Sequence, residues 1–112
     1  MTYRYPPWSK HMTALLSGID SQGRYGAGLS GSVPNLDALD TADLYSLVAI
    51  TKGAGAGRKN KLPNSVAGLI NQYARNKITA IACRERGEID TALRYERICD
   101  SIYQQFPEQY RW

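Results

Sequence analysis

The stretch that decides the fold is residues 63–106, PNSVAGLINQYARNKITAIACRERGEIDTALRYERICDSIYQQF. Apolar residues recur in both halves of it at the spacing of one helical stripe. In the first half the stripe consists of Val66, Leu69, Ile70, Tyr73, Ala74, Ile78 and Ile81. In the second half it consists of Ile89, Ala92, Tyr95, Cys99, Ile102, Tyr103 and Phe106. This spacing predicts one helix from Asn64 to about Arg86 and another from Glu88 to about Gln105.

Gly87 separates the two predicted helices. Glycine is a frequent residue just past a helix end because it adopts left-handed backbone angles without a steric penalty. Glu88 and Asp90 suit the start of the second helix, where the helix dipole favours negative charge, and Pro107 ends it. Because the connection is so short, the sequence predicts an antiparallel αα-hairpin that turns at Gly87.

One segment of this hairpin resembles a known repeat. Residues 87–95, which carry Gly87, Ala92 and Tyr95, are similar to the turn and second helix of a tetratricopeptide repeat. The resemblance implies a helical hairpin. No second copy occurs at the period of that repeat, and a lone unit cannot bury its own apolar face.

The hairpin also leads to a hypothesis about one contact between its arms. Lys77 and Glu96 each border the apolar stripe of their helix, and they lie ten and nine residues from Gly87. One hypothesis is therefore an interhelical ion pair, with the charged ends within about 6 Å of each other. The alternative is that Lys77 only lays its aliphatic stem along the apolar surface.

Two more helices are expected before the hairpin. Ser9 is a suitable N-cap for a short helix at about 9–18. A glycine- and serine-rich loop follows at about 20–34. Asn35 can cap the next helix, which is expected to reach about Lys52 with a break near Thr41, because Asp40 and Thr41 are also good caps.

The remaining segments are a loop and a tail. Residues 53–63, GAGAGRKNKLP, are predicted to be a flexible basic loop. Residues 108–112 contain Tyr110 and Trp112 and are expected to dock on the body. The sequence therefore predicts a single all-α domain over residues 1–112, a small bundle of about four helices.

Composition limits the class of protein. The chain has 112 residues, of which 43% are hydrophobic, enough for one domain with a modest core. Apolar runs are only a few residues long, so no membrane span is expected. The N-terminal residues lack the order of a secretory signal, which favours the cytoplasm.

Cys83 and Cys99 lie at unequal distances from the turn, too far apart for a disulfide, and we expect both to be reduced.

Motifs for common chemistry fail when their spacing is tested. Neither a P-loop nor a dinucleotide fingerprint fits the glycine loop, because the required glycine falls at Arg58 or Asn60. His11 is the only histidine and is expected on the polar side of its helix, so no nucleophile–base pair is indicated. The aspartates at 37, 40 and 43 are better explained as helix caps than as metal ligands. We expect no catalytic residue, cofactor or metal.

Charge is the most informative feature of the sequence. The net charge is +4, yet residues 44–84 carry no acid at all. Their seven bases are Lys52, Arg58, Lys59, Lys61, Arg75, Lys77 and Arg84. The candidate polyanion-binding residues are the four in or beside the glycine loop, namely Lys52, Arg58, Lys59 and Lys61. Alternatively, the loop is a solvated connector, or its charge complements acidic helix starts in this chain or a partner.

These observations favour two classes of function. The first is a non-catalytic helical protein that binds another protein or a second copy of itself through a helical face or its loops. The alternative is a nucleic-acid-binding protein that uses the basic loop. The long helix itself is not predicted to be a basic recognition helix, because Arg75, Lys77 and Arg84 do not share one helix face.

Overall fold

The computed structural model describes residue 29 and residues 31–112. Helices are the regular elements of this part of the chain, which contains no strand. In order they are η1 (Leu36–Ala38), α2 (Thr41–Ile50), α3 (Ala56–Asn60), α4 (Asn64–Glu85), α5 (Ile89–Gln105) and η2 (Glu108–Tyr110). The predicted all-α class is confirmed. The helix expected at 9–18 and most of the loop expected at 20–34 lie outside the described residues.

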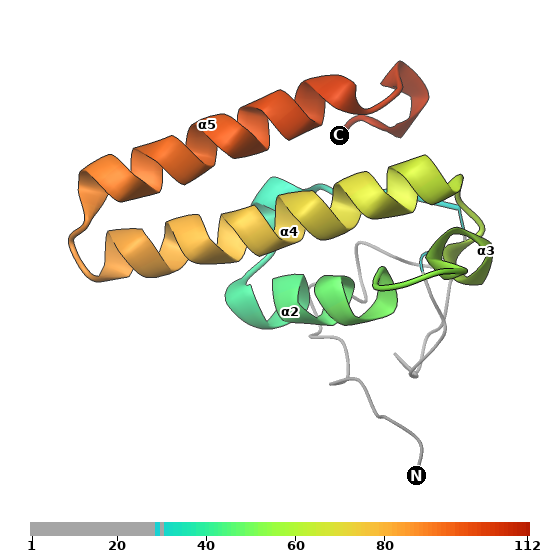
Figure 1. The fold of residues 1–112 in the computed structure, drawn as a ribbon, viewed down its shortest axis with the longest axis horizontal. Coiled ribbons are helices and arrows are strands. Elements are labelled where there is room, and N and C mark those ends of the chain that lie inside the picture. Colours follow the sequence, from blue (N-terminus) through green and yellow to red (C-terminus); the bar gives the residue numbers. More distant parts are fainter. Residues whose placement is uncertain (1–28, 30) are drawn as a thin grey trace, which may run out of the picture.

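The C-terminal half is the predicted hairpin. Helices α4 and α5 run antiparallel over most of their lengths (Figure 1). Gly87 has a φ of 79°, the left-handed conformation that closes a helix end at low cost for glycine. The Glu88 N–H then donates to the Cys83 carbonyl at 2.8 Å. The turn at Gly87 is confirmed.

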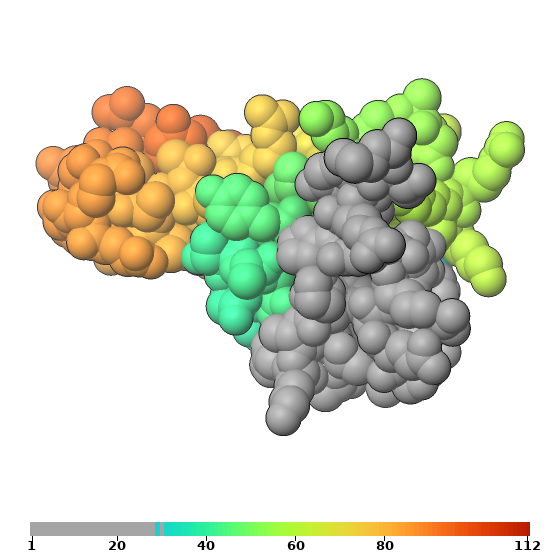
Figure 2. Space-filling view, turned by 90° about the horizontal axis from the view of Figure 1, so that it is seen from below, coloured from blue at the N-terminus to red at the C-terminus, as the bar shows by residue number. Residues whose placement is uncertain are grey.

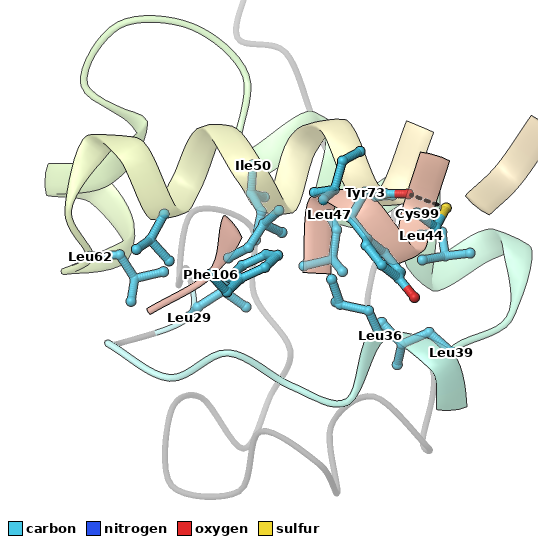
Figure 3. Close-up of a cluster of buried hydrophobic side chains, with 14 residues drawn as sticks. Leu29, Leu36, Leu39, Leu44, Leu47, Ile50, Leu62, Tyr73, Cys99 and Phe106 are labelled. Carbon is cyan, nitrogen blue, oxygen red and sulfur yellow. Dashed lines mark hydrogen bonds between the residues drawn. The ribbon is translucent and has the colours of Figure 1, made fainter. Parts of the chain in front are cut away.

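Helix α4 is the centre of the molecule, because α5, α2 and α3 all pack against it. Figure 1 shows α5 along one side of α4 and α2 along the other, while η1 crosses behind it. The apolar core fills the space between these elements. In Figure 3, Phe106 lies near Leu29 and Leu62, and Tyr73 lies near Leu36 and Leu39.

The expected break in the helix after Asn35 is also present. The Asn35 side chain accepts a hydrogen bond from the Asp37 N–H at 3.0 Å and starts η1. The Asp40 carboxylate accepts one from the Asp43 N–H at 2.9 Å and starts α2. Two consecutive caps divide this segment because each satisfies a backbone N–H that has no partner within its helix.

The segment at 53–63 is more ordered than predicted. Residues 56–60 form α3, so the prediction of a flexible loop over the whole stretch is wrong. Gly53 and Gly55 have φ values of 84° and 85° and turn the chain into this helix. Gly57 is buried against the next turn, and a Cβ atom placed there would lie only 2.6 Å from the Leu62 carbonyl oxygen. Glycine at this position serves close packing.

Asn60 fixes α3 to the rest of the fold and is fully buried. Its side-chain oxygen accepts a hydrogen bond from the Leu29 N–H at 2.9 Å. Its amide group donates to the Ile50 carbonyl at 3.0 Å and to the Ala56 carbonyl at 2.8 Å. Its own carbonyl accepts from the Gly31 N–H at 2.7 Å. One asparagine therefore connects the end of α2, the start of α3 and the segment before η1.

The C-terminal residues dock on the body, as expected. The Trp112 ring makes edge-to-face contacts with Tyr73, Tyr103 and Phe106, with ring centroids 4.9, 4.7 and 5.2 Å apart. The Tyr103 hydroxyl donates to the Trp112 carbonyl. Because such aromatic pairs contribute beyond the area they bury, this tail is part of the fold.

The hypothesised ion pair between Lys77 and Glu96 is not among the salt bridges of the described residues, where each of the two side chains pairs with another partner. The Lys77 Nζ lies 3.3 Å from the Asp37 carboxylate, because η1 crosses α4 at that point. Glu96 receives two hydrogen bonds from the Arg84 guanidinium across the hairpin. A planar guanidinium matches a carboxylate at two points, which a lysine cannot do.

Candidate functional site

One face of α4 is left uncovered by the other elements that the structure describes. It carries Gly68, Gln72, Arg75 and Thr79, which follow one another at helical spacings of four, three and four. Gln72 and Arg75 are exposed, whereas Tyr73 and Ala74 beside them are buried. Residues of this face line a hollow together with Tyr45 of α2 and Tyr95 of α5, the helices that run along the two sides of α4 (Figure 1).

The first hollow on this face lies between α2 and α5 and has a volume of about 580 Å³. Tyr45 and Val48 of α2 form one wall, and Tyr95 of α5 belongs to the other. Residues of α4 line the rest, among them Gln72 and Arg75. Tyr45 is 57% exposed, which is a large aromatic surface to leave in water.

The second hollow continues from the first toward α3 and has a volume of about 650 Å³. Gln72 and Arg75 line both hollows, so the two are adjoining parts of one depression. Its other side is formed by the end of α2 and the glycine turn, from Thr51 to Ala56. We call the two hollows together the α4 groove.

The wall formed by the end of α2 is held in place from both sides. The Asn71 amide of α4 donates to the Val48 carbonyl at 3.1 Å and to the Thr51 hydroxyl oxygen at 3.3 Å. Asn60 holds the Ile50 carbonyl from the other direction. The groove therefore has a fixed shape near Lys52.

The polar residues that line the α4 groove are either positively charged or uncharged. Its charged residues among those described are Lys52 and Arg75, and no aspartate or glutamate lines it. Within the described part of the chain, neither cation forms an ion pair with a carboxylate. Amide side chains supply half of the other polar side chains in the described lining, namely Asn64, Asn71, Gln72 and Asn76. Such a surface can bind an anionic or hydrogen-bonding ligand flanked by aromatic rings.

The four candidate polyanion-binding residues are divided by the structure. Lys52 lines the α4 groove, whereas Arg58, Lys59 and Lys61 lie on α3 and at its end, outside both hollows. All four are exposed. Figure 2 shows side chains of the yellow-green region around α3 projecting beyond the body. They form a basic tip, which we define as Arg58, Lys59 and Lys61.

Three groove residues were missed by reasoning from the sequence. Arg75 belonged to the acid-free block, but only its spacing from Gly68 and Thr79 could have shown that it lies on an uncovered face. The apolar spacing of its helix places Tyr95 on the buried stripe, and no pattern in the sequence singles out Tyr45. Of the three cations of α4, Arg75 lines the hollows, whereas Lys77 pairs with Asp37 and Arg84 pairs with Glu96.

A second polar cluster lies on the opposite side of α4, around the Asp37 carboxylate. The Tyr73 hydroxyl donates to it at 2.5 Å, the Trp112 indole N–H at 3.0 Å, and the Lys77 ammonium lies 3.3 Å away. Partial burial raises the pKa of Asp37, but the hydrogen bonds from Tyr73 and Trp112 and the charge of Lys77 outweigh it, so the pKa is lowered. Burial, together with the bond to Asp37, raises the pKa of Tyr73. The cluster holds η1 and the tail against α4.

Other chemistry has little support in the described residues. Cys83 and Cys99 are free and buried, as expected, and burial raises the pKa of the Cys99 thiol to about 11. A thiol with so high a pKa is a poor nucleophile. No cluster of three or more potential metal ligands occurs within the described ranges. His11 lies outside them.

The fold and the groove define a small all-α protein with a cationic, aromatic-walled depression on its central helix. No family model, no curated protein and no solved structure matches the chain. Among its described helices, none combines the length and the apolar character required to cross a membrane. Its function is therefore inferred from the geometry of this site.

Proposed function

We propose that this chain is a non-catalytic cytoplasmic protein that binds another protein through the α4 groove. The observation that carries the proposal is the uncovered face of the central helix, bounded by Tyr45 and Tyr95. Tyrosine is favoured at protein interfaces because it offers a large apolar surface with one polar group. The volume of each hollow taken by itself is within the range that binding sites occupy.

The shape of the groove supports a segment of a partner as its occupant. The lining residues of α4 extend from Asn64 to Thr79, which corresponds to about 22 Å along the helix axis. An extended peptide of about seven residues has that length. The amide groups along the floor could satisfy the backbone of such a segment, as buried polar groups require.

Site-specific photocrosslinking would test this proposal. A photoreactive phenylalanine replaces Gln72, which lies where the two hollows meet, and the variant is expressed in the cells that naturally contain the protein. Gln104, an exposed glutamine of α5 outside the groove, is the matched control position. We expect a discrete covalent adduct with one protein, or with a second copy of this chain, from position 72 and not from position 104. Equal labelling at both positions, or none at either, contradicts the proposal.

Nucleic-acid binding by the basic tip is the second candidate. It is favoured by the exposure of Arg58, Lys59 and Lys61 within one short segment. The test is fluorescence anisotropy with labelled duplex DNA and single-stranded RNA at about 50 and 200 mM salt, a range over which phosphate contacts weaken strongly. Binding that falls with salt and disappears when the three residues become alanine supports this candidate. No binding at low salt removes it.

A further inference from the structure

We infer that the α4 groove recognises an acidic segment of its partner, with Arg75 as the central anchor and Lys52 as the second cationic contact. The inference rests on the proposed function and specifies the chemistry of the occupant. Its first support is charge complementarity, because both charged groups in the described lining are cations.

The second support is that no carboxylate of the described residues neutralises these two cations. Lys77, Arg84 and Arg86 each lie beside a carboxylate. Arg75 and Lys52 have no such partner among the described residues. A carboxylate entering the groove therefore gains an interaction without displacing one, and a guanidinium can hold it at two points.

The third support is the position of Arg75. It lines both hollows, so it lies between the aromatic walls and the glycine turn. A carboxylate bound there leaves room for an apolar side chain between Tyr45 and Tyr95 and for a second acid near Lys52. The expected occupant is thus a segment that carries two acidic residues and at least one large apolar residue within about seven positions.

The observations favour a peptide over a nucleic acid in this groove. Among the described residues, only two cations line the groove, and the amide groups suit a peptide backbone better than a row of phosphates, whose binding depends on neutralising cations. The basic tip lies outside both hollows. Nucleic acid in the α4 groove is therefore an outcome of the test that contradicts the inference.

Binding of model peptides to the full chain provides the test. The probe is a fluorescein-labelled peptide of about ten residues with a repeated Glu-Leu-Asp-Phe pattern, measured by anisotropy. The same peptide with Gln and Asn in place of Glu and Asp keeps the shape and removes the charge. A labelled dT oligonucleotide of about ten nucleotides is the third probe.

Charge reversals locate the contact. We expect Arg75→Glu and Lys52→Glu each to weaken binding of the acidic peptide about tenfold or more, the loss typical of a charge-assisted hydrogen bond. Arg75→Lys retains the charge and loses the two-point geometry, so its effect should be smaller. Arg97→Glu is the matched control, because Arg97 is exposed on α5 and lines neither hollow. Circular dichroism checks that every variant is folded.

The inference is overturned if the neutral peptide binds as tightly as the acidic one, if neither binds, or if Arg97→Glu weakens binding as much as Arg75→Glu. It is also overturned if only the oligonucleotide binds in an Arg75-dependent way. Failure of the proposed function is distinguishable from these results. A protein adduct at position 72 together with no preference for the acidic peptide contradicts the acidic occupant alone.

Discussion

Replacing Asn60 by alanine tests whether one buried side chain holds α3 in the fold. The substitution removes three hydrogen bonds, with Leu29, Ile50 and Ala56 as partners. Each contributes about 0.5–1.5 kcal/mol net, and each partner left without a hydrogen bond in the interior costs further free energy. Because the site is fully buried, water cannot restore all three. We expect the free energy of unfolding to fall by about 3 kcal/mol.

The size of this effect is measurable by urea and thermal unfolding followed by circular dichroism. For a chain of this size, a loss of about 3 kcal/mol lowers the unfolding midpoint by roughly 10–15 °C. Asn76→Ala is the matched control, since the Asn76 side chain donates to the Gln72 carbonyl of its own helix. Removing that bond while improving helix propensity should change the stability by less than about 0.5 kcal/mol.

The Asn60→Asp variant separates hydrogen bonding from volume. It replaces the amide donor with an oxygen facing the carbonyls of Ile50 and Ala56, and it buries a charge. At pH 7 it should be less stable than the alanine variant, and protonation at low pH should recover part of the loss. An alanine variant within about 1 kcal/mol of the original protein would refute the proposed role of Asn60, because three lost bonds cannot cost so little.

Two further predictions concern close packing and pH. Gly57→Ala should lower the free energy of unfolding by about 1–3 kcal/mol, because its Cβ meets the Leu62 carbonyl oxygen. Gly68→Ala has open space around its Cβ and should stabilise α4 by up to about 1 kcal/mol. Unfolding in urea distinguishes the two variants, and equal effects contradict the packing described. The lowered pKa of Asp37 means that its contribution is fully present above its ordinary pKa of 3.8 and is lost as the pH falls through the lowered value. Asp37→Asn should therefore be less stable than the original protein at pH 7, and the difference should shrink as the pH falls. Tyr73→Phe removes a donor to this carboxylate and should show the same trend more weakly. A difference in stability that does not depend on pH contradicts a stabilising role of the ionised Asp37.

The parts of the fold that follow from local signals were predictable from the sequence. The hairpin needed only apolar spacing and Gly87, and the division before Thr41 needed only the caps Asn35 and Asp40. These signals act within a few residues of one another, so they can be read without knowing the tertiary structure. The free state of the two cysteines followed from the same hairpin.

The parts that depend on distant contacts could not be predicted in this way. Helix α3 was read as a loop because its order depends on Asn60, whose partner Leu29 is 31 positions away. The sequence suggests Glu96 as a partner for Lys77, and nothing local indicates that Asp37 lies beside α4. The groove was missed for the same reason, since an uncovered helix face is known only once its neighbours are placed.

The two asparagines that hold the end of α2 have a consequence for any encounter at the groove. Asn60 and Asn71 fix the backbone just before Lys52 through the carbonyls of Ile50 and Val48. The ordering entropy of this wall has therefore already been lost during folding, before any ligand arrives. An occupant gives up its own freedom and little of the protein's, so its affinity should depend mainly on how rigid that occupant is when free.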